Sequence, residues 1–329
     1  MSVRRFLIVA AIGTGLPAAS GIAQQNRPDA AAPTETRLRV PGASLYVRTI
    51  GRGPSVLVLH GGPDFDSSYL LPEMDALSDG YRLIYYDQRA RGKSAEKVHA
   101  EDITLATDIA DLNAVRQHFG LGSVVVLGHS WGAVLALEYA LRHPTSVSRL
   151  ILLNPAPASA SDRQALVTSY LRQLGPDMAR QNQIRNGKAY KEGDPDAVAA
   201  RYRIHFEHAF ARTADYEKVM LRMDSAFHRQ GKTGIIKART AEDRLYSDTW
   251  ERPGYDLMPR LRGLRIPTTV IISDRDFIPS AIGEHIAQAI PGAKLVTLEE
   301  CGHFSYLECQ PQVRRAIDAF LSRGSGSRP

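Results

Sequence analysis

Residues 126–133 read Val-Leu-Gly-His-Ser-Trp-Gly-Ala, and this stretch decides how the rest of the sequence is interpreted. Ser130 follows an apolar run that is typical of a buried strand, and it precedes residues with helical spacing. Gly128 and Gly132 stand two places before it and two places after it. In a tight strand-to-helix turn these two positions collide unless both residues are small. The pattern therefore predicts an exposed nucleophilic serine rather than an ordinary turn residue.

Strands and helices alternate along much of the chain on both sides of this turn. Apolar or alternating runs predict a hairpin over 37–50 and strands over 56–59, 82–86, 123–127, 149–153, 268–273 and 293–298. Helical spacing predicts helices over 102–119, 133–142, 280–290 and 311–321. This alternation is typical of an α/β fold with a mostly parallel, doubly wound sheet.

The alternation stops between Leu153 and Thr268. Because a segment of this length is too long for a structureless connection in a compact domain, it needs elements of its own. Helices are expected over 162–174, 195–210, 216–227 and 235–245. We therefore predict a helical lid over 156–254, inserted into a core formed by 36–155 and 255–322 and followed by a loose tail over 323–329.

The first residues have the pattern of a secretory signal peptide. Arg4 and Arg5 precede an apolar stretch over 6–19, and small residues end the segment at Ala23. We predict cleavage after Ala23, a disordered lead-in over 24–35, and a periplasmic or secreted protein. A frayed cytosolic N-terminus is the alternative.

Composition limits the partners of this chain of 329 residues, of which 43% are hydrophobic. Its 41 basic and 35 acidic residues give a net charge of +6 without any run of like charges, which favours solubility over nucleic-acid binding. No apolar stretch is long enough to span a bilayer, so no stable membrane insertion is expected once the signal is removed. Cys301 and Cys309 could pair in an oxidising compartment, but the sequence does not decide this. The oligomeric state is also left open.

A serine nucleophile needs a base, and that base needs an orienting acid. In this architecture the order along the chain is serine, then Asp or Glu, then histidine. His303 lies in the loop after the last predicted strand, which places it over the same sheet edge as Ser130. Asp276 and Asp274 compete for the acid, and we favour Asp276 because it lies further into its loop. The other possible acid position carries Asn154, which has no carboxylate.

Acyl transfer also needs hydrogen-bond donors for the oxyanion. The backbone N–H of Trp131, directly after the nucleophile, is one candidate. The second is the N–H of Gly62, in the His-Gly-Gly-Pro loop over 60–63 after the first buried strand. A plain turn is the alternative for that loop.

Together these residues resemble the α/β-hydrolase fold, and more narrowly the prolyl aminopeptidase (proline iminopeptidase) branch. That branch combines H-G-G-P-G, D-Q-R-G-x-G-x-S and G-x-S-W-G-G, which correspond here to 60–64, 87–94 and 128–133. The similarity covers roughly 37–155 and 255–322. It implies a triad of Ser130, Asp276 and His303, with Gly62 and Trp131 as the oxyanion hole.

Three positions depart from the motifs of that branch, since Asp64, Ala90 and Ala133 replace glycines. Asp64 places a carboxylate near the substrate entrance, although capping of the following helix is the simpler interpretation. The resemblance also implies lid carboxylates that hold the free α-ammonium of the substrate. Glu207 is our candidate among several, and a solvated helix face is its alternative.

No metal and no cofactor are expected. His205, Glu207 and His208 do not have the spacing of a zinc-binding helix, and no glycine-rich phosphate loop follows a strand. The sequence thus predicts a serine hydrolase that acts on a small molecule or short peptide, with proline aminopeptidase activity favoured. Carboxylesterase or lactonase activity is the alternative, and a non-catalytic ligand-binding protein is an alternative of another class. Dehalogenase chemistry would need an aspartate where Ser130 stands.

Overall fold

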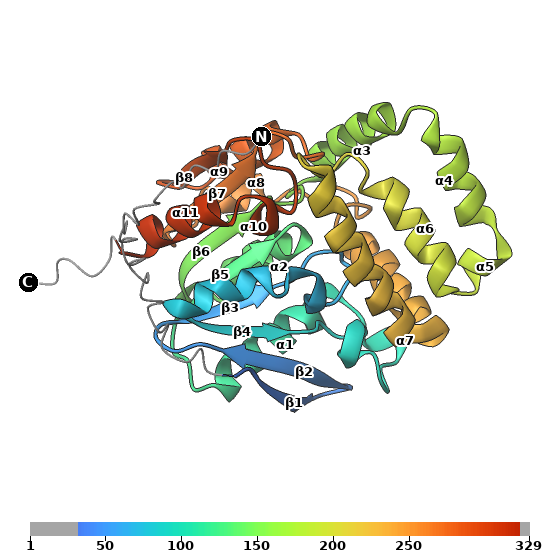
Figure 1. Ribbon diagram of the computed structural model, residues 1–329. Helices are drawn as coiled ribbons and strands as arrows, with labels where there is room; N and C mark the ends of the chain where they lie inside the picture. Colours follow the sequence, from blue (N-terminus) through green and yellow to red (C-terminus); the bar gives the residue numbers. More distant parts are fainter. Residues whose placement is uncertain (1–31, 323–329) are drawn as a thin grey trace, which may run out of the picture. The chain divides into compact units, whose positions relative to one another are not determined.

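The computed structural model describes residues 32–322, which contain one eight-stranded sheet (Figure 1). The strand order is β1-β2-β4-β3-β5-β6-β7-β8; β1 and β2 form the antiparallel edge, and the strands from β4 to β8 are parallel. The strands are β1 (Thr34–Val40), β2 (Ala43–Ile50), β3 (Ser55–Leu59), β4 (Arg82–Tyr86), β5 (Val124–His129), β6 (Val147–Leu153), β7 (Thr268–Ser273) and β8 (Lys294–Leu298). The predicted α/β class with a mostly parallel sheet is confirmed.

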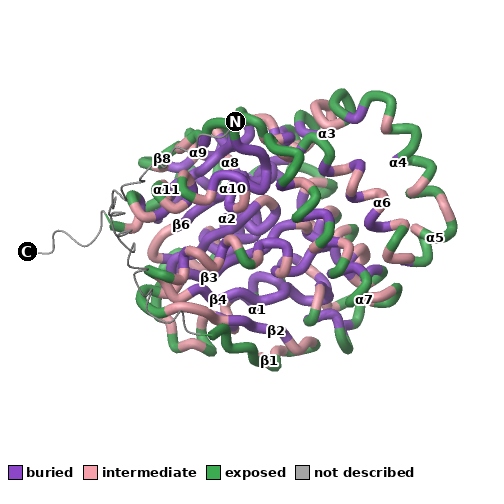
Figure 2. The backbone as a smooth tube through the Cα atoms, in the orientation of Figure 1, coloured by how far each residue is buried: buried purple, intermediate pink, exposed green. Residues whose placement is uncertain are grey.

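Both faces of the sheet are buried, which explains the continuous apolar runs of its central strands. Val56 and Val58 belong to the core on one face, and Leu57 and Leu59 belong to the core on the other. The covering helices are α1 (Leu105–His118), α2 (Trp131–Arg142), α8 (Met258–Leu261), α9 (Ser280–Ala289), α10 (Ser305–Glu308) and α11 (Gln310–Ser322). Short 3₁₀ turns lie at Ser67–Leu70, Glu73–Asp79, Gly92–Ser94, Ala100–Asp102 and Pro144–Ser146. Figure 2 shows the central strands of the sheet as buried, whereas the edge strands β1 and β8 are largely exposed.

The segment between β6 and β7 is helical, and it extends beyond the carboxyl ends of the strands (Figure 1). Its helices are α3 (Ala160–Leu174), α4 (Asp177–Asn186), α5 (Lys188–Lys191), α6 (Pro195–His205) and α7 (Thr213–Asp248). α7 joins two predicted helices, with a break at Gly231, where φ is 62°. Sequence periodicity missed α4 because only one of its residues, Gln181, is buried, so it has no apolar stripe.

Several predictions concern the ends of the chain. The predicted signal peptide, most of the lead-in and the tail lie outside the described residues. β1 begins at Thr34, so the last two residues of the predicted lead-in belong to the sheet.

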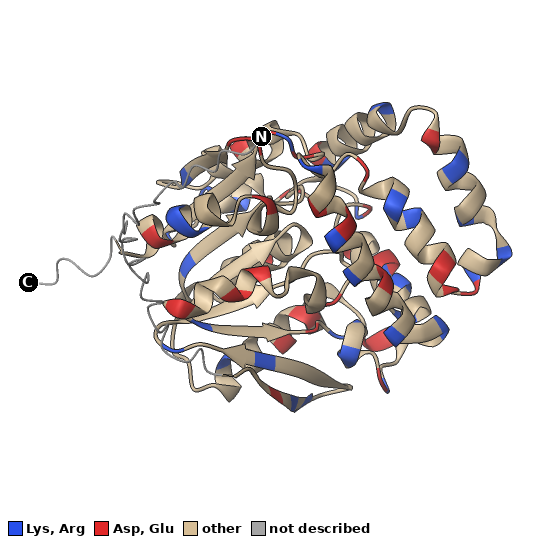
Figure 3. Ribbon diagram, in the orientation of Figure 1, with Lys and Arg blue, Asp and Glu red and all other residues tan. Residues whose placement is uncertain are grey.

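No helix within residues 32–322 combines the length and the apolar character needed to cross a membrane. Basic and acidic side chains are interspersed over the core and the lid (Figure 3).

The pairing of the two cysteines, which the sequence left open, is formed in the structure. Cys301 and Cys309 are joined by a disulfide, with their Cα atoms 6.0 Å apart. The bridge closes the loop that contains His303 onto the start of α11.

Candidate active site

Ser130 lies at the turn between β5 and α2, in a backbone conformation that the flanking glycines permit. Its φ is 55° and its ψ is −120°, and it is the N-cap of α2. A Cβ on Gly128 would come within 2.3 Å of the carbonyl oxygen of Gly132, and a Cβ on Gly132 would come equally close to that of Leu59. Both positions must therefore be glycine, as the motif predicted. The Ser130 hydroxyl has no hydrogen bond to any residue of the described part of the chain, so it is free to meet a substrate.

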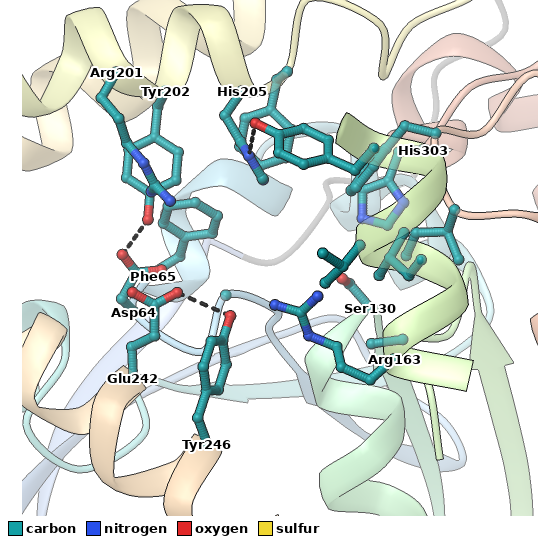
Figure 4. A pocket seen from close by; sticks show the side chains of 18 of the residues that line it. Asp64, Phe65, Ser130, Arg163, Arg201, Tyr202, His205, Glu242, Tyr246 and His303 are labelled. Atoms are coloured by element: carbon teal, nitrogen blue, oxygen red, sulfur yellow. Dashed lines mark hydrogen bonds between the residues drawn. The ribbon is translucent and has the colours of Figure 1, made fainter. Parts of the chain in front are cut away.

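His303 and Asp276 are brought together from the loops after β8 and β7. The Nδ1 atom of His303 lies 3.0 Å from both carboxylate oxygens of Asp276, and both side chains are almost fully buried. Asp276 also accepts hydrogen bonds from the backbone N–H of Ile278 at 2.9 Å and from the amide of Asn154 at 2.8 Å. A carboxylate bonded in this way holds the imidazole in one tautomer, with Nε2 left for the hydroxyl. Figure 4 shows His303 and Ser130 on the same side of the pocket.

Asn154 is therefore part of the site. The sequence analysis had noted it only because it has no carboxylate at a position where the acid could stand. It follows β6 with a positive φ of 45°, and its amide bridges Ser273 and Asp276. Its own oxygen accepts a hydrogen bond from Ser305 at 2.6 Å. The competing aspartate, Asp274, accepts from the backbone N–H of Cys301 and has a structural role in the loop.

A chain of hydrogen bonds connects the loop after β3, the nucleophile turn and the histidine loop. The N–H of Gly61 donates to the Tyr69 hydroxyl at 2.7 Å, and that hydroxyl lies 2.8 Å from Nδ1 of His129. The other nitrogen, Nε2 of His129, lies 3.0 Å from the carbonyl oxygen of His303. Burial holds the pKa of His129 well below its ordinary value, so the ring is neutral. Because a carbonyl oxygen only accepts, Nε2 carries the proton, and Nδ1 accepts from Tyr69.

The predicted oxyanion donors lie on two neighbouring segments. Gly62 lines the pocket beside Ser130 and has a φ of 126°. Trp131 is fully buried with its ring against Trp250, so only its backbone amide can serve the site. That amide is at the first position of α2, where a helix leaves its N–H groups without intrahelical partners.

The second matched motif, 87–94, supports the site from outside the pocket. Gln88 donates its backbone N–H to Nε2 of His60 and its side-chain amide to the carbonyl oxygen of His60, which fixes the loop that carries Gly62. Arg89 pairs with Asp111 at 2.6 Å. None of the residues 87–94, all of them described, lines the pocket. Their buried charges are structural.

The two other residues that replace glycines of the family pattern, Ala90 and Ala133, do not line the pocket. Ala90 keeps a positive φ of 67° and is fully buried. An alanine in this conformation costs about 1 kcal/mol or slightly more relative to glycine. Ala133 is fully buried within α2.

A pocket of about 490 Å³ lies between the strand ends and the lid. Core loops, including those of Ser130, His303 and Gly62, line it on one side, and α3, α4, α6 and α7 supply most of the lid side. A cavity of this size suits a small ligand.

Four carboxylates line this pocket, and two of them, Asp64 and Glu242, lie next to each other in Figure 4. Asp64 accepts a hydrogen bond from the Tyr202 hydroxyl, and Glu242 accepts one from the Tyr246 hydroxyl at 3.0 Å. Burial, and then the neighbouring charge of Asp64, raises the pKa of Glu242 to about 7. Burial also raises the pKa of Asp64. Two close carboxylates in a desolvated wall form a site for a cation.

The sequence placed one of these carboxylates correctly and missed the other. Asp64 lines the pocket, and the simpler interpretation, that it caps the following helix, is wrong because Asp66 caps the following 3₁₀ turn instead. The placement of Glu207 in the cleft is also wrong. α6 ends at His205, the apolar Phe206 and Ala209 turn inward, and Glu207 is left exposed outside the pocket. Glu242 could not be identified because it lies in a long polar helix without a motif.

The comparisons with known proteins agree with this geometry. A family model described as alpha/beta hydrolase fold matches residues 54–309. A proline iminopeptidase from Lactobacillus helveticus is 27% identical over 285 residues, which cover 83% of this chain and 92% of that protein. Among solved structures, a proline iminopeptidase from Mycobacterium smegmatis has a TM-score of 0.64 and 21% identity, covering 88% of this chain and 98% of its own. The enol-lactonase from Burkholderia xenovorans LB400 has a TM-score of 0.64 and 22% identity, covering 87% and 100%.

The chain therefore belongs to the α/β-hydrolase fold family. Within that family its sequence is similar to proline iminopeptidases, and the prediction of a serine hydrolase is confirmed at the level of the enzyme class.

Proposed function

We propose that the protein is an exported serine hydrolase that releases the N-terminal residue, preferably proline, from short peptides. The observation that carries this proposal is the pair Asp64 and Glu242, which lines the same pocket as Ser130. An aminopeptidase must hold a free ammonium group close to the scissile bond, and two adjacent carboxylates provide that charge. Similarity to proline iminopeptidases supports the same choice.

Each residue of the site has the role that its counterpart has in a serine hydrolase. The oxygen of Ser130 attacks the scissile carbonyl carbon while Nε2 of His303 takes the hydroxyl proton. The N–H groups of Gly62 and Trp131 stabilise the resulting anion. His303 then gives its proton to the leaving amine, the carbon–nitrogen bond breaks, and an acyl-enzyme remains. Water, deprotonated by His303, cleaves the ester and restores Ser130. Asp276 keeps the imidazole in the required tautomer throughout.

Ester or lactone hydrolysis is the second candidate, because every catalytic part is shared and the structural neighbours include an enol-lactonase. The two functions differ only in what the pocket wall recognises. An ester substrate does not need a cation site, so it would leave Asp64 and Glu242 without a role. This difference favours the peptidase.

Turnover of a prolyl arylamide and of a short acyl ester by the purified protein would separate these functions. The peptidase predicts the higher kcat/KM for the arylamide, and arylamide turnover at background with ester turnover above it would overturn it. A fluorophosphonate probe should label Ser130 in the wild type and leave Ser130→Ala unlabelled. A folded wild type that stays unlabelled would instead indicate a ligand-binding protein.

Export rests on the N-terminal pattern over 1–23 and is supported by the disulfide, since such bonds persist in oxidising compartments. The mature protein is expected to begin at Gln24. The intact mass of protein recovered from the periplasm or medium checks this, and a chain that keeps residues 1–23 in the cytosol would contradict it.

A further inference from the structure

Arg163 is a cation in the pocket wall that the protein itself does not neutralise. It lies in the first turn of α3 and lines the same pocket as Ser130. Its guanidinium group lies 5.6 Å from the ring centre of Tyr246 and 5.2 Å from that of Trp250. Its side chain makes no hydrogen bond or ion pair with any residue between 32 and 322. Figure 4 shows the group extending into the pocket on the side of Ser130.

The polar groups around it are engaged with one another. Tyr246 donates to Glu242, Tyr202 donates to Asp64, and the Tyr170 hydroxyl lies 2.7 Å from Nδ1 of His205. Asp243 and Glu251 line the outer part of the pocket, but neither forms an ion pair with Arg163. The free N–H donors of this guanidinium therefore face the space that a substrate would occupy.

Two further arginines, Arg185 and Arg201, line the pocket without an ion pair to any residue between 32 and 322. Arg185 is exposed on α4, so solvent hydrates its charge, and Arg201 is the one to compare with Arg163. It stacks on the ring of Tyr202 at 4.3 Å, and Asp64 and Glu242 are among the charges that act on it. Its positive charge is thus offset by the carboxylate pair, which keeps one negative charge for a substrate ammonium when both carboxylates are ionised. Arg163 forms no ion pair with a carboxylate of the described residues, so it is the better anion site.

A guanidinium group remains charged at any physiological pH, and its fork of donors matches a carboxylate. The rings of Tyr246 and Trp250 lie within cation–π distance of the group and do not compete for its N–H donors. We propose that Arg163 binds a free carboxylate of the substrate, so that dipeptides with an unblocked C-terminus are the preferred class. This inference rests on the proposed function. A dipeptide brings an ammonium, a scissile carbonyl and a carboxylate, and the pocket offers a carboxylate pair, a nucleophile and an unpaired cation.

The test compares prolylglycine, whose carboxylate is free, with prolylglycinamide, which differs only in lacking that charge. The wild type is expected to show a kcat/KM about 10- to 100-fold higher for the free acid, the range of one charged hydrogen-bonded pair. Arg163→Gln should raise KM for prolylglycine by a similar factor and leave the amide within about twofold. Arg163→Lys should fall between, because a point charge replaces the bidentate fork. Arg172→Gln, an exposed arginine of the same helix outside the pocket, is the matched control.

The outcomes separate this inference from the function on which it rests. Equal turnover of acid and amide by the wild type, or equal losses for both in Arg163→Gln, would overturn it. Turnover of a prolyl arylamide in the same assay would show that the aminopeptidase proposal survives that result. Absence of turnover with all three prolyl compounds would overturn both.

Discussion

Arg91 and Arg201 are both arginines in the interior of this molecule, and they differ in what surrounds them. Arg91, in the loop after β4, bonds Asp108 at 2.5 Å and Gln88 at 2.6 Å. The Nε atoms of both arginines are buried without an acceptor, but Arg201, in the lid, also has no hydrogen-bond or ion-pair partner for its other nitrogens in the part of the chain that the structure describes. A buried charge is costly unless it is paired. Arg91 meets that requirement through a direct ion pair with Asp108. In the pocket, Arg201 is offset only without direct bonds by Asp64 and Glu242, and Arg163 has no ion pair with any residue between 32 and 322, so charge remains there for a ligand.

Asp276 is also a buried charge with a partner, but that partner, His303, changes its charge during the reaction. Asp276→Asn should lower kcat for a prolyl arylamide by about 10⁴-fold, since the imidazole loses its required tautomer and the stabilisation of its charged form. The free energy of unfolding should change far less than the activation free energy of the reaction does. Asp274→Asn, two residues earlier in the same loop, is the control, with kcat expected within about threefold of wild type. Similar losses in both variants would contradict the assignment.

Substitutions at the Arg91–Asp108 pair should lower the stability of the protein and leave substrate recognition unchanged. Asp108→Asn leaves Arg91 charged, buried and without its counter-ion, so the free energy of unfolding should fall by about 3–5 kcal/mol. Chemical denaturation measures this loss, and KM should change little in the protein that remains folded. The exposed pair Lys188–Glu192 provides the control, because Glu192→Gln should cost less than about 0.5 kcal/mol. If Asp108→Asn remained as stable as wild type and had a raised KM, the structural role of this ion pair would be contradicted.

Substitutions at the pocket carboxylates should weaken substrate binding rather than lower stability. Glu242→Gln should raise KM for a prolyl arylamide by about 10- to 100-fold at pH 8, because it removes one partner of the ammonium group. Glu207→Gln, outside the pocket, should match wild type. With a pKa near 7, Glu242 ionises as pH rises from 6 to 8, so the wild-type KM should fall over that range and that of Glu242→Gln should stay constant. A parallel pH dependence of KM in both proteins would contradict this role.

The same pKa shift fixes the sign of the effect on stability. The folded pKa of Glu242 lies above its ordinary value of 4.5, so the folded state holds a proton that the unfolded state has lost between about pH 4.5 and 7. The contribution of this group to stability therefore decreases as pH rises through that window. Glu242→Gln should be at least as stable as wild type at pH 8, measured by denaturation. This is the reverse of what Asp108→Asn should show.

The sequence predicted the catalytic constellation better than the substrate pocket, for a physical reason. Ser130, Asp276 and His303 each follow a strand of one parallel sheet, and the carboxyl ends of such strands share one edge. Chain order and strand position were therefore enough to bring Asp276 and His303 together. Glu242 and Arg163 lie on lid helices, whose positions over the sheet depend on packing between segments distant in sequence. No local pattern distinguishes them from Glu207, which the fold leaves in solvent.

By itself the sequence determined the α/β sheet, the tight turn at Ser130 and the loops that carry its partners, because these depend on local periodicity and on the space that glycine leaves. Only the tertiary structure decided which lid charges face the nucleophile, that Asn154 orients Asp276, and that Cys301 and Cys309 meet. Those features depend on contacts between residues far apart in the chain. Burying an unpaired charge costs free energy, and which charges are buried depends on how the lid packs on the sheet.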